Sequence, residues 1–152
     1  MLNYKKIIFV STENTCLSPL AEAIMKKEIK DIDMQIESRG LVVLFSEPPN
    51  QKCASVANEK GINIDDHKSQ PLEEEDFGVD VLILVMSKQN KQKIYEEFKD
   101  AINVYTVKEF VGELGDLKTP YGGGIEEYKD NHEIMERLIK KVAEKLAGEE
   151  EK

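Results

Sequence analysis

The sequence predicts an α/β fold, a four-stranded parallel sheet with helices on both faces, and two observations carry this prediction. Short apolar runs rich in β-branched residues alternate along the chain with segments whose apolar residues recur at helical spacing. The most apolar run, Val79–Met86, is typical of a buried strand in a parallel sheet. Because 152 residues suit one hydrophobic core, we expect a single three-layer domain over residues 1–152.

The first half of the chain predicts two strands and two helices. Ile7–Val10 is a short β-rich run that ends at a polar cluster. A helical pattern begins at Pro19, since proline is favoured at the first position of a helix. Met34–Ser38 alternates apolar and polar residues, which indicates a strand. A second helix then runs through Cys53 and ends near Gly61.

The second half repeats this alternation and closes on a long helix. In chain order, the predicted elements are strand Val79–Met86, helix Lys88–Phe98, strand Val104–Thr106, the loop Val111–Gly124, helix Ile125–Ala147 and a solvated tail at residues 148–152. The first of these helices is expected to carry on one face Ile94, Tyr95 and Phe98. The terminal helix has a stripe of apolar residues at every fourth position, namely Ile134, Leu138, Val142 and Leu146.

Composition excludes several classes of function. The chain has 21 Lys+Arg against 30 Asp+Glu, and this net charge of −9 argues against general binding to nucleic acid or to anionic membrane surfaces. No apolar stretch approaches the roughly 20 residues of a membrane span. Two cysteines, Cys16 and Cys53, are too few for a secreted disulfide framework, so we expect a cytoplasmic protein.

Neither a metal nor a cofactor is expected. The two histidines, His67 and His132, and the two separated cysteines have no spacing of the zinc-binding kind. The acidic run Glu73–Asp76 could resemble a cation site. It fits better as the first turn of a short helix, where negative charge complements the helix dipole.

Polar residues follow the first predicted strand, where an α/β sheet carries its sites. Ligands in such sheets bind beyond the carboxyl ends of the strands, and Ser11–Ser18 lies there, between strand and helix. A loop that wraps into a helix N-terminus points backbone N–H groups inward and binds anions. The alternative is a plain polar turn. The loop around Thr119 could reach the same edge of the sheet.

From about Lys6 to Leu146, the chain resembles the low-molecular-weight protein tyrosine phosphatases. That family's loop has the pattern Cys-x-Gly-Asn-x-Cys-Arg-Ser-Pro, and Ser11–Pro19 is the matching segment. Gly115–Gly123 resembles the family's later motif Asp-Ile-Pro-Asp-Pro-Tyr-Gly-Gly. The resemblance implies the family's fold and an anion-binding loop formed by Ser11, Thr12, Glu13, Asn14, Thr15, Cys16, Leu17 and Ser18.

The same resemblance implies that three reactive groups are missing. The family's nucleophilic cysteine corresponds to Ser11, its phosphate-binding arginine to Leu17 and its general acid to Thr119. An electropositive loop can lower the pKa of a thiol to roughly 3.5–7.5, whereas a serine hydroxyl would need a general base. A leucine offers no hydrogen bonds to phosphate. We therefore expect a catalytically silent protein.

The missing chemistry has no obvious replacement elsewhere in the chain. The only arginines are Arg39 and Arg137, and neither follows a cysteine at the spacing that the family's loop requires. Asp116, three residues before the general-acid position, is a weak candidate to take over protonation. Phosphatase turnover is accordingly expected to be negligible.

Glu13 stands where the family's loop has a glycine, and two interpretations remain open. Its carboxylate either points into water or binds the loop's own N–H groups as a built-in anion. Either way, a negative charge beside the loop repels phosphate.

Other family positions are kept, and the resemblance implies that they hold the loop in shape. The residues expected to form this hydrogen-bonded support are Asn14, Ser18, Ser38 and His67. Cys16 matches the family's second loop cysteine, which can bond to the nucleophile there, but Ser11 cannot make that disulfide. A free, buried Cys16 is expected, and a bond between Cys16 and Cys53 is left open.

Three functions remain compatible with these residues. The favoured one is a silent relative that binds a protein partner, such as a phosphoprotein, or holds phosphate or sulfate weakly in the loop. The second is an enzyme with residual or altered phosphatase activity, in which Ser11 is the nucleophile. The third is a purely structural subunit. No nucleic acid or membrane partner is expected.

Overall fold

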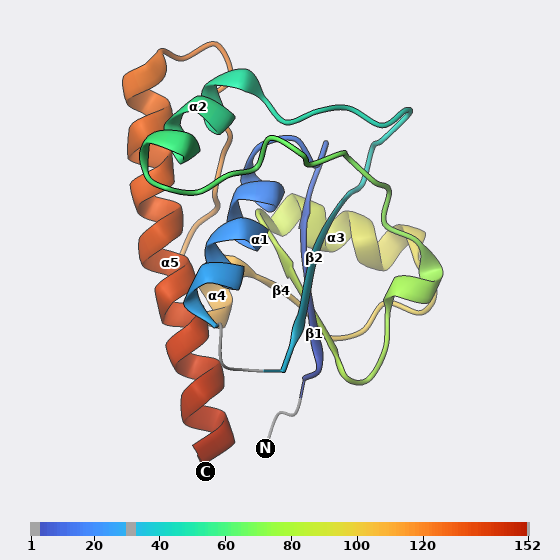
Figure 1. The fold of residues 1–152 in the computed structure, drawn as a ribbon. Coiled ribbons are helices and arrows are strands. Elements are labelled where there is room, and N and C mark those ends of the chain that lie inside the picture. The colour runs from blue at the N-terminus through green and yellow to red at the C-terminus, as the bar shows by residue number, and fades with distance from the viewer. Residues whose placement is uncertain (1–3, 30–32, 152) are drawn as a thin grey trace.

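The computed structural model, which describes residues 4–29 and 33–151, contains a parallel sheet of four strands in the order β2–β1–β3–β4 (Figure 1). The strands are β1 (Lys6–Ser11), β2 (Gln35–Gly40), β3 (Val81–Val85) and β4 (Val104–Thr106). In register, Ile7 of β1 lies between Ile36 and Leu82 of its neighbours. The predicted α/β class with a four-stranded parallel sheet is therefore confirmed.

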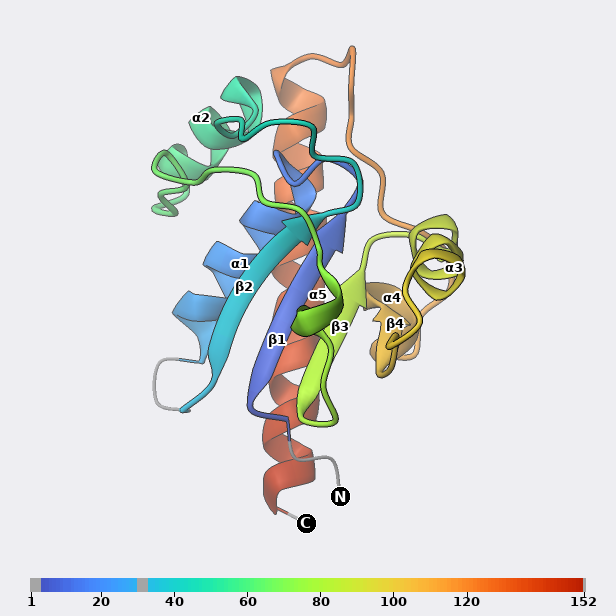
Figure 2. The ribbon, with the colours of Figure 1, turned by 90° about the vertical axis from the view of Figure 1, so that its right-hand side faces the viewer.

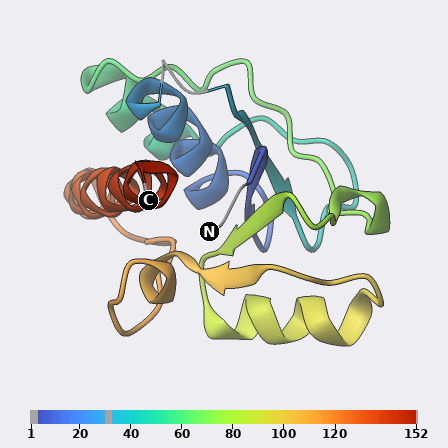
Figure 3. The ribbon, with the colours of Figure 1, turned by 90° about the horizontal axis from the view of Figure 1, so that it is seen from below.

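Helices cover both faces of this sheet (Figures 2 and 3). They are α1 (Leu17–Glu28), α2 (Gln51–Glu59), α3 (Lys88–Glu97), the single turn α4 (Val107–Phe110) and α5 (Ile125–Glu151), with a 3₁₀ turn η1 at Glu74–Asp76. Ile7 and Phe9 of β1 pack with α1 and α5, whereas Ile8 and Val10 pack with Ile94 of α3. Because alternate residues of a strand point to opposite faces, one apolar strand serves both cores.

Helix α1 and strand β3 begin at other residues than predicted. Helix α1 begins at Leu17 rather than Pro19, so the proline lies in the first turn, where helical N–H groups have no intrahelical partner and none is lost. Strand β3 begins at Val81, two residues after its predicted start. The reason is that Val79 is exposed and the carbonyl of Asp80 accepts hydrogen bonds from Lys5 and Lys6 outside the ladder.

Apolar faces were predicted well but not completely. On α3, Ile94 is buried and Tyr95 is exposed, because consecutive helical residues lie about 100° apart and cannot share one narrow face. On α5, Leu138 and Val142 are buried as predicted. Ile134 is 40% exposed, and Met135 fills its place in the core.

The terminal helix is longer than predicted. It continues to Glu151, so residues 148–151 of the predicted tail are helical, and Lys152 lies outside the described residues. Glutamate is a good helix former, which explains why the acidic end extends the helix. In the part of the chain that the structure describes, no helix is both long enough and apolar enough to cross a membrane.

The carboxyl ends of the strands meet at one edge of the sheet. There β1 ends at Ser11 and leads into α1, and β3 ends at Val85 and leads into α3. The segment before α5 returns to this edge, where the N–H of Leu117 donates to the carbonyl of Met86 at 2.8 Å. These three connections surround the candidate site.

Candidate functional site

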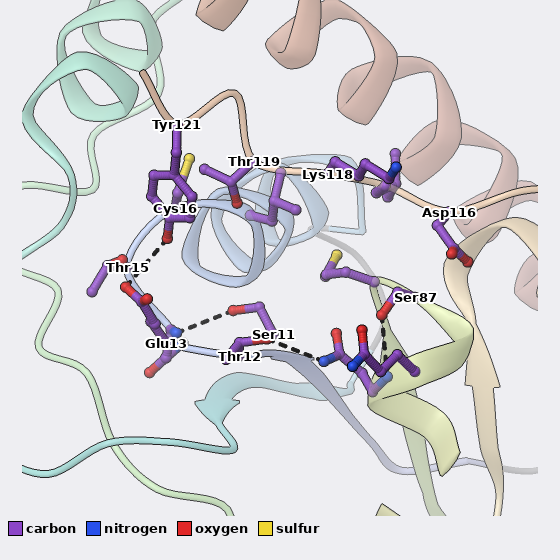
Figure 4. A pocket seen from close by; sticks show the side chains of 16 residues that line it. Ser11, Thr12, Glu13, Thr15, Cys16, Ser87, Asp116, Lys118, Thr119 and Tyr121 are labelled. Atoms are coloured by element: carbon purple, nitrogen blue, oxygen red, sulfur yellow. Dashed lines mark hydrogen bonds between the residues drawn. The ribbon is translucent and has the colours of Figure 1, made fainter. Parts of the chain in front are cut away.

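A cavity of about 340 Å³ opens at this edge of the sheet (Figure 4). Its walls come from the loop after β1, the turn into α3 and the segment that precedes α5. The structure brings together all three predicted positions of missing chemistry, since Ser11, Leu17 and Thr119 line the cavity. Asp116 and Tyr121 lie in the same wall as Thr119.

Asn14 braces the loop from beneath. Its backbone is in the left-handed region, at φ 59°, a conformation that asparagine tolerates better than most residues. The fully buried side chain donates to Ser18 Oγ at 2.8 Å and to Ser38 Oγ at 3.0 Å, and it accepts from the N–H of Gln70 at 3.0 Å. His67 Nε2 donates to the Asn14 carbonyl at 2.7 Å. The four residues expected to support the loop thus lie in one network.

The hydroxyl of Ser11 belongs to the same network, and among the described residues no side chain that could act as a base hydrogen-bonds with it. Ser11 Oγ lies 2.6 Å from Ser18 Oγ and accepts from the N–H of Asn14 at 3.1 Å. The nearest carboxylate along the network is Glu22, which accepts from Ser38 Oγ at 2.6 Å. The amide of Asn14 separates the two ends, and because its NH₂ group only donates, it cannot relay a proton.

Leu17, the predicted counterpart of the family's phosphate-binding arginine, has a hydrocarbon side chain. It is 2% exposed and packs in the core between the sheet and α1, although it also borders the cavity. Among the described residues that line the cavity, Lys118 is the one cationic side chain. The floor of the site therefore offers backbone N–H groups and the N-terminus of α1 to an anion, without a guanidinium.

Asp116 is engaged in capping a helix. Its Oδ1 accepts a hydrogen bond from the N–H of Lys88, the first residue of α3, at 3.0 Å. Ser87 caps the same helix by accepting from the N–H of Asn90. Asp116 thus leaves a negative charge in the cavity wall, while Thr119 brings only a hydroxyl to the general-acid position.

Glu13 lies at the rim of the cavity, so neither predicted orientation describes it fully. Its Oε2 accepts a hydrogen bond from the hydroxyl of Tyr121 at 3.3 Å (Figure 4). Within residues 4–29 and 33–151, no loop N–H donates to its carboxylate, so the interpretation as a built-in anion is wrong. Burial and the Glu13 charge raise the pKa of Tyr121, which keeps the phenol protonated as a donor.

The two cysteines are buried, free and in contact. Cys53 Sγ donates to the carbonyl of Cys16 at 3.6 Å. The hydrogen bond with Cys53 and burial both raise the pKa of the Cys16 thiol. Because a thiolate is the reactive form, Cys16 is a poor substitute for the missing nucleophile even though it borders the cavity.

Two contacts of the site were missed by sequence reasoning. Gln70 contributes a backbone N–H, which has no signature in the sequence, and the bond between Glu13 and Tyr121 joins residues 108 positions apart. Glu22 had a weak signal, since it lies one helical turn beyond Ser18 and faces the same network. Among the described residues, no group of three or more His, Cys, Asp or Glu side chains lies close enough together to hold a metal ion.

Comparison with known proteins gives a consistent family. The family model described as "Low molecular weight phosphotyrosine protein phosphatase" matches residues 6–152. The low molecular weight protein-tyrosine-phosphatase PtpB of Staphylococcus haemolyticus is 35% identical over 137 residues, covering 90% of this chain and 96% of that protein. A protein-arginine-phosphatase of Bacillus subtilis is 36% identical over 144 residues, covering 92% and 95%.

One of the similar solved structures has a serine in its active site. It is a Cys-to-Ser mutant of the arginine phosphatase YwlE with a phosphorylated active-site serine. The two folds superpose with a TM-score of 0.84 at 35% sequence identity, covering 93% of this chain and 95% of that one.

Proposed function

Because the chain belongs to the low molecular weight phosphotyrosine protein phosphatase family, we propose that it is a catalytically silent member that binds a phosphorylated protein partner in the cytoplasm. One observation carries this proposal. A loop braced by buried hydrogen bonds surrounds a cavity in which Ser11, Leu17 and Thr119 replace all three reactive groups.

Each replacement lowers the rate of phosphoryl transfer. The hydroxyl of Ser11 is far less acidic than a thiol, and its hydrogen-bond partners in the described part of the chain are Ser18 and the N–H of Asn14, neither of which is a base. Leu17 cannot make the two charge-assisted hydrogen bonds of an arginine, each worth about 1.5–3 kcal/mol. Loss of a general acid at Thr119 costs about 10²–10⁴ in rate. Since all three effects act in one direction, turnover is expected to be negligible.

Binding is supported by what the loop retains. The N–H groups that close around a helix N-terminus attract oxyanions without any side-chain chemistry. Glu13 and Asp116 oppose this attraction, so free phosphate or sulfate is expected to bind weakly. Leu44 and Phe45, both strongly exposed in the segment after β2, offer an apolar surface that suits a protein partner. The N–H of Leu41 in that segment donates to the carbonyl of Ser11.

The test combines turnover with binding. Wild-type protein is incubated with p-nitrophenyl phosphate at acid and neutral pH, and inorganic phosphate is titrated into labelled protein by NMR. We expect no turnover above background and chemical-shift changes confined to the loop residues. Turnover at a rate ordinary for the family would refute the silent role, and shifts absent at every phosphate concentration would favour a purely structural subunit.

A second candidate function is single phosphorylation of Ser11, and the phosphorylated serine of the YwlE mutant favours it. In this reaction, the bond between Ser11 Oγ and phosphorus forms as the donor's bond to phosphorus breaks, and the hydroxyl proton leaves with the donor's leaving group. Intact-mass measurement after incubation with a phosphoarginine-containing peptide would reveal one added phosphoryl group. The Ser11→Ala variant is the control, and an unchanged wild-type mass would eliminate this candidate.

A further inference from the structure

The cavity has a dipolar arrangement of charge. At its floor, the loop N–H groups and the N-terminus of α1 create positive potential. At its mouth, Glu13 and Asp116 place two exposed carboxylates on opposite walls (Figure 4). Across the described residues, neither carboxylate forms a salt bridge, although Lys118 lines the same cavity. Negative charge at the mouth is therefore left without a cationic partner.

Glu13 is held in this position by contacts across the mouth. The hydroxyl of Tyr121 donates to Glu13 Oε2 at 3.3 Å, and Tyr121 also hydrogen-bonds with Thr15 of the loop. Tyr121 comes from the segment before α5, so two distant segments fix the carboxylate above the floor. The carboxylate of Glu13 is thus one of the charged groups that line the cavity.

We propose that Glu13 makes the cavity select a phosphorylated guanidinium, the side chain of phosphoarginine, over phosphotyrosine. This inference rests on the proposed function, since it requires that the loop bind the phosphoryl group. Phosphoarginine brings an anionic phosphoryl group to the floor and carries a positive guanidinium next to it, at the level of the carboxylate. Phosphotyrosine brings an uncharged ring there, which leaves Glu13 unpaired and its repulsion of the phosphoryl group uncompensated.

The experiment measures dissociation constants for one peptide sequence in three forms, with phosphoarginine, phosphotyrosine or unmodified arginine at the same position. The wild-type protein is expected to bind the phosphoarginine form about three- to fivefold more tightly than the phosphotyrosine form, the size that a partly exposed ion pair supplies. In Glu13→Gln this preference should disappear, with phosphoarginine binding weakened and inorganic phosphate binding strengthened.

Controls separate this inference from the function on which it rests. Glu96→Gln removes an exposed carboxylate on α3 that accepts a hydrogen bond from Gln92, outside the residues that line the cavity, and it should leave all constants unchanged. Equal affinity for the two phosphorylated forms, unaffected by Glu13→Gln, would overturn the role of Glu13 and leave phosphoryl binding intact. Unmodified arginine bound as tightly as phosphoarginine would also overturn it. If neither the phosphorylated peptides nor inorganic phosphate bind, both the proposed function and the role of Glu13 are refuted.

Discussion

At Leu17, one side chain decides both packing and chemistry. As the first residue of α1, Leu17 packs in the core, and it brings no charge to the cavity that it borders. A long polar side chain at this position could extend into the cavity, because the leucine already borders it. An arginine can therefore be introduced at this position by substitution. The stability lost through poorer packing can then be measured separately from the gain in phosphate binding.

Leu17→Arg is expected to strengthen binding of inorganic phosphate about tenfold, since a guanidinium adds charge-assisted hydrogen bonds. Thermal unfolding should show a modest loss of stability, about 1–3 kcal/mol, because apolar packing is lost. Leu17→Lys is the matched variant, and its gain should be smaller because an ammonium cannot bond in a bidentate way. Equal gains from the two variants would contradict the expected geometry.

Asn14 tests how the loop keeps its shape. In both Asn14→Ala and Asn14→Gly, the hydrogen bonds to Ser18, Ser38 and Gln70 are lost. Only alanine also resists the left-handed backbone at φ 59°. Urea denaturation should therefore find the alanine variant less stable than the glycine variant by about 1–2 kcal/mol. Identical stabilities would show that the loop relaxes away from this conformation.

At the scale of elements, α5 carries a buried histidine at its contact with α1 and α2. His132 is 1% exposed, and no group in residues 4–29 or 33–151 forms a hydrogen bond with either of its ring nitrogens. Burial lowers its pKa below the ordinary value, against a smaller opposing effect of the Glu136 charge. The neutral ring is thus the form that the folded protein accommodates.

The stability of the protein is accordingly expected to fall as the pH drops below about 6.5, where the unfolded chain takes up a proton at His132 and the folded chain does not. His132→Phe should remove this part of the pH dependence, as chemical denaturation at pH 5 to 8 would reveal. Hydrogen bonds from Arg137 and Lys141 hold the pKa of Glu113 at about 2, so Glu113 adds its own loss of stability as the pH falls toward 5. This contribution is the same in both proteins, and the difference between their profiles isolates His132. A wild-type profile parallel to that of the variant would contradict the expectation.

Helices and strands with a clear periodic pattern of apolar residues were predictable, whereas the residues at which they begin and end were not. Strands such as β1 and β2 follow from apolar runs and alternation, since these patterns respond to burial on the sheet. The missed turn α4 is four residues long, which is too short to show a helical period. The end of α5 was misplaced because a run of glutamates is common both in helices and in solvated tails.

The parts of the candidate site that lie in continuous segments of the sequence were predictable. Ser11 and Leu17 were placed by one continuous segment, and Thr119 by a second segment that resembles a family motif. The orientation of Glu13 could not be derived, because it depends on how Tyr121 approaches across the cavity. Contacts of this kind depend on tertiary packing, which local residue patterns do not predict.

At the scale of the whole molecule, the fold and the site have separate requirements. The sheet, its two cores and the network under the loop depend on residues that this chain retains. The three positions at which we propose that reactive groups are missing contribute almost nothing to that network beyond the hydroxyl of Ser11. On the proposed function, this chain lacks the reaction of its family and keeps the architecture.

The most direct test of whether fold and catalysis have separate requirements is to introduce a thiol, a guanidinium and a carboxylate at the three positions together. The variant carrying Ser11→Cys, Leu17→Arg and Thr119→Asp is compared with the wild-type chain for hydrolysis of p-nitrophenyl phosphate. We expect the variant to gain measurable turnover while the wild type stays at background. Hydrolysis by the wild type at a rate comparable to that of the variant would contradict the conclusion that this cavity lacks the means to cleave a phosphate ester.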